Sequence, residues 1–600
     1  MGAPESSRRR SRHEHRLARR AVRVNGSIAA LSRWLVAAPW RPLLLIVLPL
    51  CAVALFGRGL WTPDEPREFD LAVTMLRSGQ LWFPHFVGQP YCEKPPLTYW
   101  VSVVAMSMFG SSPAIARLPN LLWITLTWWA VFRLARALAA SAAQGAQPTL
   151  PTGLAVALIL TTSWLALQRE VWLATDGPLL AATAVSLLGL WLTLDVRSSS
   201  PRYRGPLLFS IGMTLAFFAK NSFGWLVPGL ALLAWIVWMR RPRDLLRPEL
   251  WLAGMGTVGA VGFWLWQVSM QPHGGECVQQ LLWSNGLGRL LPIATPEGYH
   301  LGHRNWFGKY VLQLPWLLMP WTALAIAAMR LAWTRIRESN DRTGAWRFCV
   351  CAAAPAWLTL FLSATGRDVY FIPSLVGVAC GIGLWLAEAR GRSWLERQAL
   401  TVTDVFIGLL CGLIALAAVY LAYDTAKSLI NMQILGPLLA LGLAPWALTR
   451  ALPEPVPRLA RGALTLAVTF VLCAPALLPA MDRTQDLAPL LRAAAPYLDR
   501  HVITMGSEET LQAYMESELR LQPRMAKDVA TVQRWLQDDP GLRVLVRADA
   551  TAKWRRYVES HPGVPRERAE VRALKDLGLT ELRTWQIDKG RAYVLMGIRP

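Results

Sequence analysis

Long runs of apolar residues, separated by short polar segments rich in arginine, dominate the pattern of this chain. A helix needs about 20 mainly apolar residues to cross the hydrocarbon core of a bilayer, and fewer where its ends lie in the interface. The pattern therefore predicts a polytopic α-helical membrane protein. The fourteen candidate runs cover residues 43–57, 97–109, 119–138, 152–168, 178–195, 206–219, 223–239, 250–270, 309–329, 347–364, 370–388, 401–423, 431–449 and 460–480.

The arginines between the runs indicate how many of them cross the membrane. The run 97–109 is short and follows two prolines, and leaving it out places nearly every short arginine cluster on the side of the basic N-terminus. Positive charge gathers on the cytoplasmic side of membrane proteins. The sequence thus predicts thirteen crossings, with the N-terminus inside and the C-terminus outside. The predicted inner clusters are Arg133/Arg136, Arg197/Arg202/Arg204, Arg240/Arg241/Arg243/Arg247, Arg330/Arg335/Arg337/Arg342, Arg390/Arg392/Arg397 and Arg450/Arg458/Arg461.

Composition excludes two other classes of protein. Of the 600 residues, 54% are apolar and 17% are charged, whereas soluble proteins carry about 25% charged residues. So hydrophobic a chain does not remain disordered. The net charge of +23 comes from basic residues spread between apolar runs rather than gathered on one domain. This distribution favours a membrane topology, with lipids as neighbours, over nucleic-acid binding.

The same pattern divides the chain into three predicted parts. They are a basic cytoplasmic segment (1–42), a membrane domain (43–480) with external loops 58–118 and 271–308, and an external tail (481–600). The run 43–57 is interpreted as a retained anchor, because no small-residue cleavage site follows it. The tail alternates short apolar strands with amphipathic stretches, which predicts a small α/β domain. The strands are expected over 502–505, 542–546 and 591–596, and the amphipathic stretches over 507–520 and 527–537.

Acidic residues, scarce in the chain as a whole, cluster in the first predicted external loop. Four of them, Asp64, Glu65, Glu68 and Asp70, lie within seven residues. Carboxylates at the mouth of an apolar bundle are costly unless they are paired or functional. The structural alternative is that Thr62 or Asp64 caps a helix whose dipole Glu65 complements.

Two further pairs of residues in the external loops carry open alternatives. Lys94 is presented by the rigid Pro95-Pro96 backbone, which suits a functional cation, but it could equally form a structural ion pair with Glu93. Cys92 and Cys277 both fall in external loops. They could form a disulfide in an oxidising compartment, or remain as two unpaired thiols.

Five stretches of the sequence resemble the bacterial aminoarabinose transferase family. This family belongs to the C-type glycosyltransferases (GT-C), which include the protein O-mannosyltransferases. The resemblance implies a GT-C fold of about thirteen transmembrane helices with a C-terminal extracytoplasmic domain. The stretches are Asp64-Glu65, Glu93-Lys94-Pro95-Pro96-Leu97-Thr98-Tyr99-Trp100, Ala116-Arg117-Leu118-Pro119, Ala174-Thr175-Asp176-Gly177-Pro178 and Tyr370-Phe371-Ile372-Pro373-Ser374-Leu375.

The resemblance also implies a reaction. Such enzymes take a sugar from a polyprenyl phosphate and transfer it to an acceptor on the outer face of the cytoplasmic membrane. The acceptor would be lipid A or a related glycolipid, with 4-amino-4-deoxy-L-arabinose as one candidate sugar, or a protein hydroxyl as in O-mannosylation. A lipid or sugar transporter is the alternative outside the enzymes. Transporters place ionisable residues near the midplane in repeated halves, which this sequence lacks.

Candidate site residues follow from the matched stretches. The catalytic candidates are Asp64, Glu65 and Asp176, and the substrate-binding candidates are Glu93, Lys94, Arg289 and Tyr370. Cations at the leaving phosphate would stabilise the charge that gathers there in the transition state. Asp64 would act as a general base on a hydroxyl acceptor, or orient an acceptor phosphate that is already ionised.

Each of three candidates also has a structural alternative. Asp176 could be the N-cap of a span that begins at Pro178, Arg289 a solvated rim charge, and Tyr370 an interfacial tyrosine.

No cofactor is predicted. Relatives can hold a divalent metal between the Glu of the Glu-Lys-Pro-Pro stretch, here Glu93, and a His of the second large external loop. His273, His300 and His303 all lie in that loop, but none has the expected spacing to Arg289. One Glu and one His are too few ligands for a zinc site.

Overall fold

A computed structural model describes most of the chain. The described residues are 27, 30–142, 150–195, 201–287, 309–338, 340–362, 367–388, 394–427, 432–445, 452, 454–505, 509–548, 568–587 and 591–598. Two predicted features lie partly outside these residues: the segment 1–42, for the most part, and the end of the loop 271–308. The loop residues concerned include Arg289, His300 and His303.

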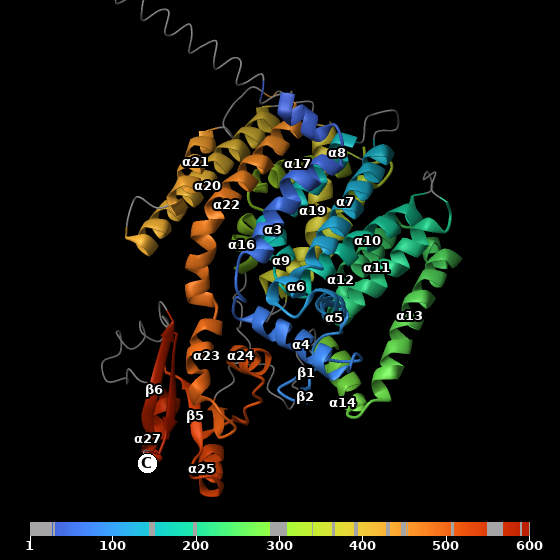
Figure 1. Cartoon of the computed structure of the whole chain (residues 1–600). Coiled ribbons are helices and arrows are strands. Elements are labelled where there is room, and N and C mark those ends of the chain that lie inside the picture. The colour runs from blue at the N-terminus through green and yellow to red at the C-terminus, as the bar shows by residue number, and fades with distance from the viewer. Residues whose placement is uncertain are drawn as a thin grey trace, which may run out of the picture.

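The described chain is mainly helical, as the apolar runs predict. Figure 1 shows the long helices gathered in one bundle, with a small sheet beyond its lower end. Each of the fourteen predicted runs coincides with one or two helices. The helices of the bundle are α2 (Trp40–Pro42), α3 (Leu48–Phe56), α7 (Asn120–Ala142), α8 (Leu150–Thr161), α9 (Trp164–Glu170), α10 (Asp176–Leu194), α11 (Arg204–Lys220), α12 (Leu226–Trp238), α13 (Pro248–Ser269), α16 (Lys309–Leu317), α17 (Thr322–Arg337), α18 (Ala345–Leu362), α19 (Leu375–Glu388), α20 (Trp394–Ala426), α21 (Met432–Leu443) and α22 (Pro455–Gln485).

Among the described residues, six helical segments are long and apolar enough to cross a membrane, and three bent pairs raise this number to nine. One of the six, Arg204–Trp238, reverses direction at its middle. Asn221 there has a φ of 48°, and a Cβ on Gly224 would lie 2.0 Å from the carbonyl oxygen of Ala216. This segment is therefore a hairpin of α11 and α12, as the two separate runs predict. The total of thirteen crossings stays a prediction.

Local chemistry explains two of the bends. α16 and α17 meet at 111°, and Pro315 and Pro320 lie before and at the break, where proline interrupts helical hydrogen bonding. α8 and α9 meet at 69°, and the hydroxyls of Thr161 and Thr162 bond back to carbonyl oxygens of the preceding turn. Such bonds compete with the backbone ladder and bend helices.

The described parts of the segments that were predicted to lie inside gather at one end of the bundle. Arg335 near the end of α17 and Trp346 near the start of α18 both donate to Glu388 at the end of α19, at 2.7 and 2.9 Å. Arg247, before α13, donates to the carbonyl of Thr193 near the end of α10 at 2.6 Å. A cavity of about 600 Å³ lies at this end between α7, α8, α17, α19 and α22.

The first external loop begins and ends at the opposite end of the bundle. Arg117, just before α7, donates to the carbonyl oxygens of Leu55 and Arg58 at the end of α3, at 3.1 and 3.2 Å. The chain between them therefore returns to the end that it left, and the apolar run 97–109 does not cross. The elements of this loop are α4 (Asp64–Ser78), β1 (His85–Phe86), β2 (Gln89–Pro90), α5 (Leu97–Phe109) and α6 (Pro113–Arg117).

A disulfide joins this loop to the next large one. Cys92 and Cys277 are bonded, and Cys277 lies in α14 (Gly274–Gln279), directly after α13. Of the two alternatives for these cysteines, the structure has the bonded one. The disulfide thus ties the segment that presents Lys94 to the helix α14.

The C-terminal region contains a five-stranded sheet of order β4-β3-β5-β7-β6. The three predicted strands are confirmed as β3, β5 and β7, and the two amphipathic stretches as α24 and α25. β6 was missed, because its alternating polar pattern is that of an exposed edge strand. The elements are α23 (Ala488–Ala494), β3 (Val502–Met505), α24 (Glu509–Leu519), β4 (Met525–Ala526), α25 (Val529–Asp538), β5 (Arg543–Arg547), α27 (Ala569–Asp576), β6 (Thr580–Ile587) and β7 (Arg591–Gly597).

The helices α22 and α24 attach this sheet region to the bundle and to the first loop. α22 continues to Gln485, across the predicted boundary at 481, and its Asp482 accepts hydrogen bonds from the backbone of Gly59 and the indole of Trp61, at 3.0 and 2.6 Å. α24 packs against α4. Figure 1 shows α4 and α24 side by side below the bundle.

Candidate active site

The helix α4 carries the acidic cluster. Its first residue is Asp64, and neither Thr62 nor Asp64 caps it: the N-cap position is Pro63, without a side-chain hydrogen bond. The predicted capping role is wrong, because Thr62 instead donates to Gln485 at the end of α22, at 2.8 Å. The Asp64 carboxylate is 21% exposed and lies 3.4 Å from the guanidinium of Arg67. It remains accessible at the rim of the site.

Glu65, the second catalytic candidate, points away from the rim into the protein. It is fully buried and accepts hydrogen bonds from the guanidinium groups of Arg58 and Arg117 and from the backbone of Trp61 and Leu173. Burial raises the pKa of Glu65, but Arg117 and Arg58 outweigh it and hold that pKa at about 2. A carboxylate so fully occupied does not reach a substrate. We therefore correct its assignment from catalytic to positioning residue.

Lys94 pairs with Glu68, not with Glu93. Its ammonium lies 2.5 Å from Glu68 Oε1, and the same oxygen accepts from Arg67 at 3.1 Å. Tyr99 donates to the other oxygen at 2.8 Å. The Lys94 side chain is 20% exposed, whereas that of Glu68 is fully buried. Glu68 therefore binds Lys94 from the buried side, and part of the Lys94 side chain stays accessible. The predicted structural pair with Glu93 is wrong.

Glu93 lies at the edge of the same cluster. Its carboxylate accepts from the hydroxyl of Tyr91 at 3.1 Å, and the Tyr91 ring lies 5.8 Å from the Arg67 guanidinium carbon. Within the described residues, no three His, Cys, Asp or Glu side chains are grouped as a metal site would need. The cofactor prediction is unchanged by this, since His300 and His303 lie outside those residues.

Asp176 and Tyr370 meet at Lys220. Asp176 is 5% exposed and opens α10, but its carboxylate caps no helix: it accepts from Lys220 Nζ at 2.5 Å. The predicted capping alternative is wrong. The same ammonium lies 4.9 Å from the centre of the Tyr370 ring, in the 3₁₀ helix η6 (Asp368–Ser374). Lys220 ends α11, so three separate elements converge here.

The described candidates form one electrostatic cluster. Arg67 bridges Asp64 and Glu68, Glu68 binds Lys94, and Lys94 acts electrostatically on the carboxylate of Asp176. The predicted site residues that the structure describes thus lie at one end of the bundle. Glu65 is the one among them that is fully buried.

Sequence reasoning did not select Arg67, Glu68 or Lys220. Glu68 lies one helical turn after Asp64, so a helix prediction for this stretch would have placed both on one face. Lys220 is an ionisable residue in the short turn between two apolar runs, which is a signal for a functional group in a membrane protein.

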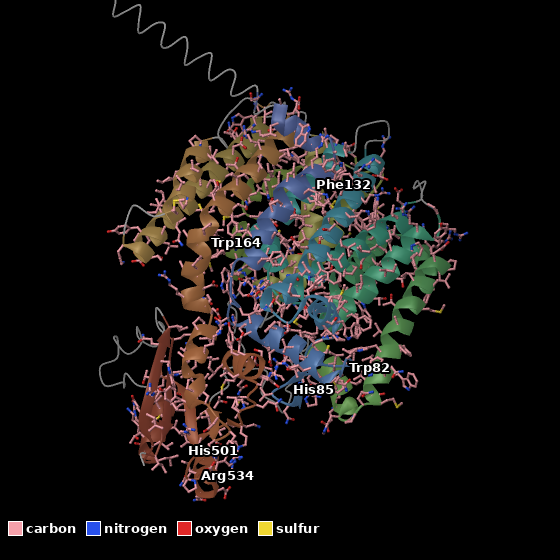
Figure 2. The ribbon with its side chains drawn as sticks, viewed as in Figure 1. Trp82, His85, Phe132, Trp164, His501 and Arg534 are labelled. Atoms are coloured by element: carbon pink, nitrogen blue, oxygen red, sulfur yellow. A yellow bond between two sulfur atoms is a disulfide. The ribbon has the colours of Figure 1, made fainter. Side chains whose placement is uncertain are left out.

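Another buried acid, Asp70, lies where α4 meets α24. Both of its carboxylate oxygens are buried without a hydrogen-bond donor, and the neighbouring acid is Glu516, which accepts from the backbone of Val87 at 2.7 Å. Burial and the charge of Glu516 raise the pKa of Asp70 well above its ordinary value, which Arg77 only partly offsets. His85, labelled in Figure 2, lies near Glu516 at the same interface.

The raised pKa of Asp70 predicts a pH-dependent stability. A carboxyl group that is protonated in the folded state and ionised in the unfolded state favours folding less as the pH rises from the unfolded pKa to the folded one. Asp70→Asn should therefore raise the melting temperature by about 1–3 °C at pH 8 and hardly change it at pH 4. Thermal melting of the purified protein across this range measures it. If the melting temperature of the variant depended on pH as steeply as that of the wild type, this prediction would be contradicted.

Comparison with known proteins agrees with the sequence motifs. No family model matches the chain. The undecaprenyl phosphate-alpha-4-amino-4-deoxy-L-arabinose arabinosyl transferase of Pseudomonas aeruginosa (strain LESB58) is 27% identical over 413 residues, 66% of this chain and 69% of the relative. The transferase of the same name from Edwardsiella ictaluri (strain 93-146) is 26% identical over 387 residues, 64% of this chain and 65% of the relative. The chain is a homologue of aminoarabinose transferases.

Solved structures show the fold. The crystal structure of ArnT from Cupriavidus metallidurans bound to undecaprenyl phosphate matches with a TM-score of 0.62 and 17% identity, over 92% of this chain and 96% of that one. The apo state of ArnT matches with a TM-score of 0.60 and 18% identity, over 91% and 96%. The predicted fold class, a polytopic membrane protein of the GT-C type with a small C-terminal sheet region, is confirmed.

Proposed function

We propose that this protein is a membrane glycosyltransferase that moves a sugar from a polyprenyl phosphate to lipid A or a related glycolipid. The sugar proposed first is 4-amino-4-deoxy-L-arabinose, as in the names of the relatives. The observation that carries the proposal is the cluster at one end of an apolar bundle, where the partly exposed cation Lys94 pairs with Glu68 and Lys220 pairs with Asp176. A lipid-linked phosphate needs such a polar site at headgroup level.

The chemistry gives the two sides of this cluster separate roles. The bond between the anomeric carbon and the phosphate oxygen breaks, and its electron pair stays on the phosphate. In this proposal Lys94, Lys220 and the hydroxyl of Tyr370 stabilise that charge as it develops, which the contact of Lys220 with the Tyr370 ring supports. The new bond joins the anomeric carbon to an acceptor oxygen, and Asp64 takes the proton if the acceptor is a hydroxyl. An ionised acceptor phosphate gives up no proton, and Asp64 then orients it.

We propose further that the active-site end faces away from the cytoplasm, across a bacterial inner membrane. Disulfides persist in oxidising compartments, and Cys92–Cys277 lies at this end. The described arginines of the predicted inner clusters, such as Arg247 and Arg335, lie at the other end, which agrees with the distribution of positive charge in membrane proteins. The residues 481–600 would then form an external domain over the site.

The direct experiment is an in vitro transfer reaction followed by mass spectrometry. Purified protein receives undecaprenyl phosphate-aminoarabinose with either lipid A or a serine-containing peptide. We expect lipid A to gain the mass of the sugar and undecaprenyl phosphate to be released. Sugar on the peptide alone would change the acceptor and keep the reaction class. Intact donor with both acceptors, for a protein that is folded and monodisperse, would refute the proposal.

Lys94 should matter for donor use more than for stability. Lys94→Ala is expected to lower kcat/KM for the donor about 10- to 100-fold, because a cation that stabilises the developing phosphate charge is lost. The melting temperature should fall only slightly, since Arg67 and Tyr99 still bind Glu68. Lys527→Ala, an exposed lysine of the C-terminal region, is the control. Unchanged donor kinetics would mean that Lys94 serves only to neutralise Glu68.

A further inference from the structure

The turn between α9 and α10 carries two buried N–H donors without acceptors. Arg169 Nε and Trp172 Nε1 are both excluded from solvent and make no hydrogen bond with described residues. Their side chains lie together, with the guanidinium carbon of Arg169 5.6 Å from the Trp172 ring. Burying a donor without an acceptor is costly, so two such donors on side chains in contact indicate an acceptor that the described residues do not supply.

The backbone that carries these donors is held firmly. Asn120 donates to the carbonyl oxygens of Glu170 and Trp172, at 2.9 and 2.8 Å. Arg58 donates to the carbonyl of Val171 at 2.9 Å, and the amide of Leu173 donates to the buried carboxylate of Glu65. The backbone that presents both donors is therefore fixed in place. They are preorganised for a group that arrives from outside.

The turn also borders the proposed active site. Arg169 and Lys94 both act electrostatically on the carboxylate of Asp176, and no oxygen of Asp176 comes within ion-pair distance of Arg169 among the described contacts. α9 packs against η6, the element of Tyr370. Arg169 is thus a cation that faces the cluster without a carboxylate of its own.

We propose that Arg169 and Trp172 form an anion subsite that binds the phosphate of the polyprenyl donor. The inference rests on the proposed function and extends its phosphate site to a turn that no sequence motif selected. Phosphate oxygens suit both donors, since a guanidinium binds them in a fork and an indole N–H adds a single bond. This gives the fully buried Glu65 a clear role, because through Leu173 it fixes the turn that presents the subsite.

The test compares two lipids that differ only in the phosphate. Binding of undecaprenyl phosphate and of undecaprenol is measured for the wild type, Arg169→Ala, Arg169→Lys and Trp172→Phe. We expect Arg169→Ala to weaken undecaprenyl phosphate binding about 10- to 100-fold and Trp172→Phe about 3- to 10-fold, with undecaprenol binding unchanged. Arg169→Lys should fall between the wild type and Arg169→Ala. The control is Arg534→Ala, at the far tip of the sheet region in Figure 2.

The outcomes separate this inference from the proposed function. A wild type that binds undecaprenyl phosphate no better than undecaprenol would remove the proposed function and the subsite together. A selective wild type with an equally selective Arg169→Ala variant would overturn the subsite alone. If Arg169→Ala weakened the binding of both lipids equally, the subsite would also be overturned, because a purely structural role of Arg169 would affect both lipids alike. Trp172→Phe keeps the ring against Trp61, so it tests the N–H in a folded protein.

Discussion

Asp64→Asn is expected to lower the rate of sugar transfer to a hydroxyl acceptor about 10²- to 10⁴-fold, the usual effect of losing a general base. The Asp64 carboxylate is the accessible acid at the rim of the cluster, whereas Glu65 and Glu68 are fully buried and paired. The variant keeps the shape of the side chain, and Arg67, which lies 3.4 Å from the Asp64 carboxylate, also binds Glu68. Transfer should therefore be lost from a protein that melts as the wild type does.

Steady-state kinetics with the purified variant provide the measurement. Asp538→Asn, at an exposed position that ends α25, serves as the control and should transfer sugar normally. Full activity of Asp64→Asn would remove this residue from the site. A loss confined to KM for the acceptor would mean that Asp64 orients an ionised acceptor and abstracts no proton.

Glu65→Gln is expected to destabilise the protein by about 3–5 kcal/mol, the cost of breaking a buried ion pair from one side. Glutamine fits the space but leaves the guanidinium groups of Arg58 and Arg117 without a counter-charge in the protein interior. Glutamine also keeps only one acceptor oxygen, so it cannot accept from both the amide of Leu173 and the amide of Trp61 as the two oxygens of Glu65 do. Activity should fall with stability, since this group positions the site.

Thermal melting in detergent measures this effect. Glu249→Gln is the matched control, because Glu249 pairs with the largely exposed Arg202 and an exposed pair contributes little. The pKa of Glu65 is depressed, so its contribution is present above its ordinary pKa of 4.5 and is lost as the pH falls through about 2. A wild-type melting temperature for Glu65→Gln at pH 7 would contradict the positioning role.

The features that depend on long stretches of sequence were predictable. Apolar runs located the helices, and the arginine distribution correctly separated the two ends of the bundle and excluded 97–109 as a crossing, because both follow from what a bilayer tolerates along some twenty residues. The strands β3, β5 and β7 are continuous apolar stretches and were found for the same reason. The bend between α16 and α17 depends on where two prolines fall within an apolar run, which hydropathy alone does not register.

The pairing of individual charges was not predictable. Adjacent residues such as Glu93 and Lys94 look like partners in the sequence, yet the partner of Lys94 is Glu68, which lies 26 residues earlier on the helix α4. Glu65 and Asp64 are neighbours with opposite environments, because successive residues of a helix point about 100° apart. Arg169 and Trp172 had no motif, and their importance emerges only from hydrogen bonds that they do not make.

The central claim is that the end of the bundle holding Asp64 and Lys94 faces away from the cytoplasm, and cysteine labelling tests it most directly. In the described chain the six unbonded cysteines are all buried, so an impermeant maleimide should report mainly on introduced positions. Ser78→Cys, exposed at the end of α4, should be labelled in spheroplasts with an intact membrane. Arg240→Cys, exposed at the other end, should be labelled only after permeabilisation. The reverse pattern would contradict the account.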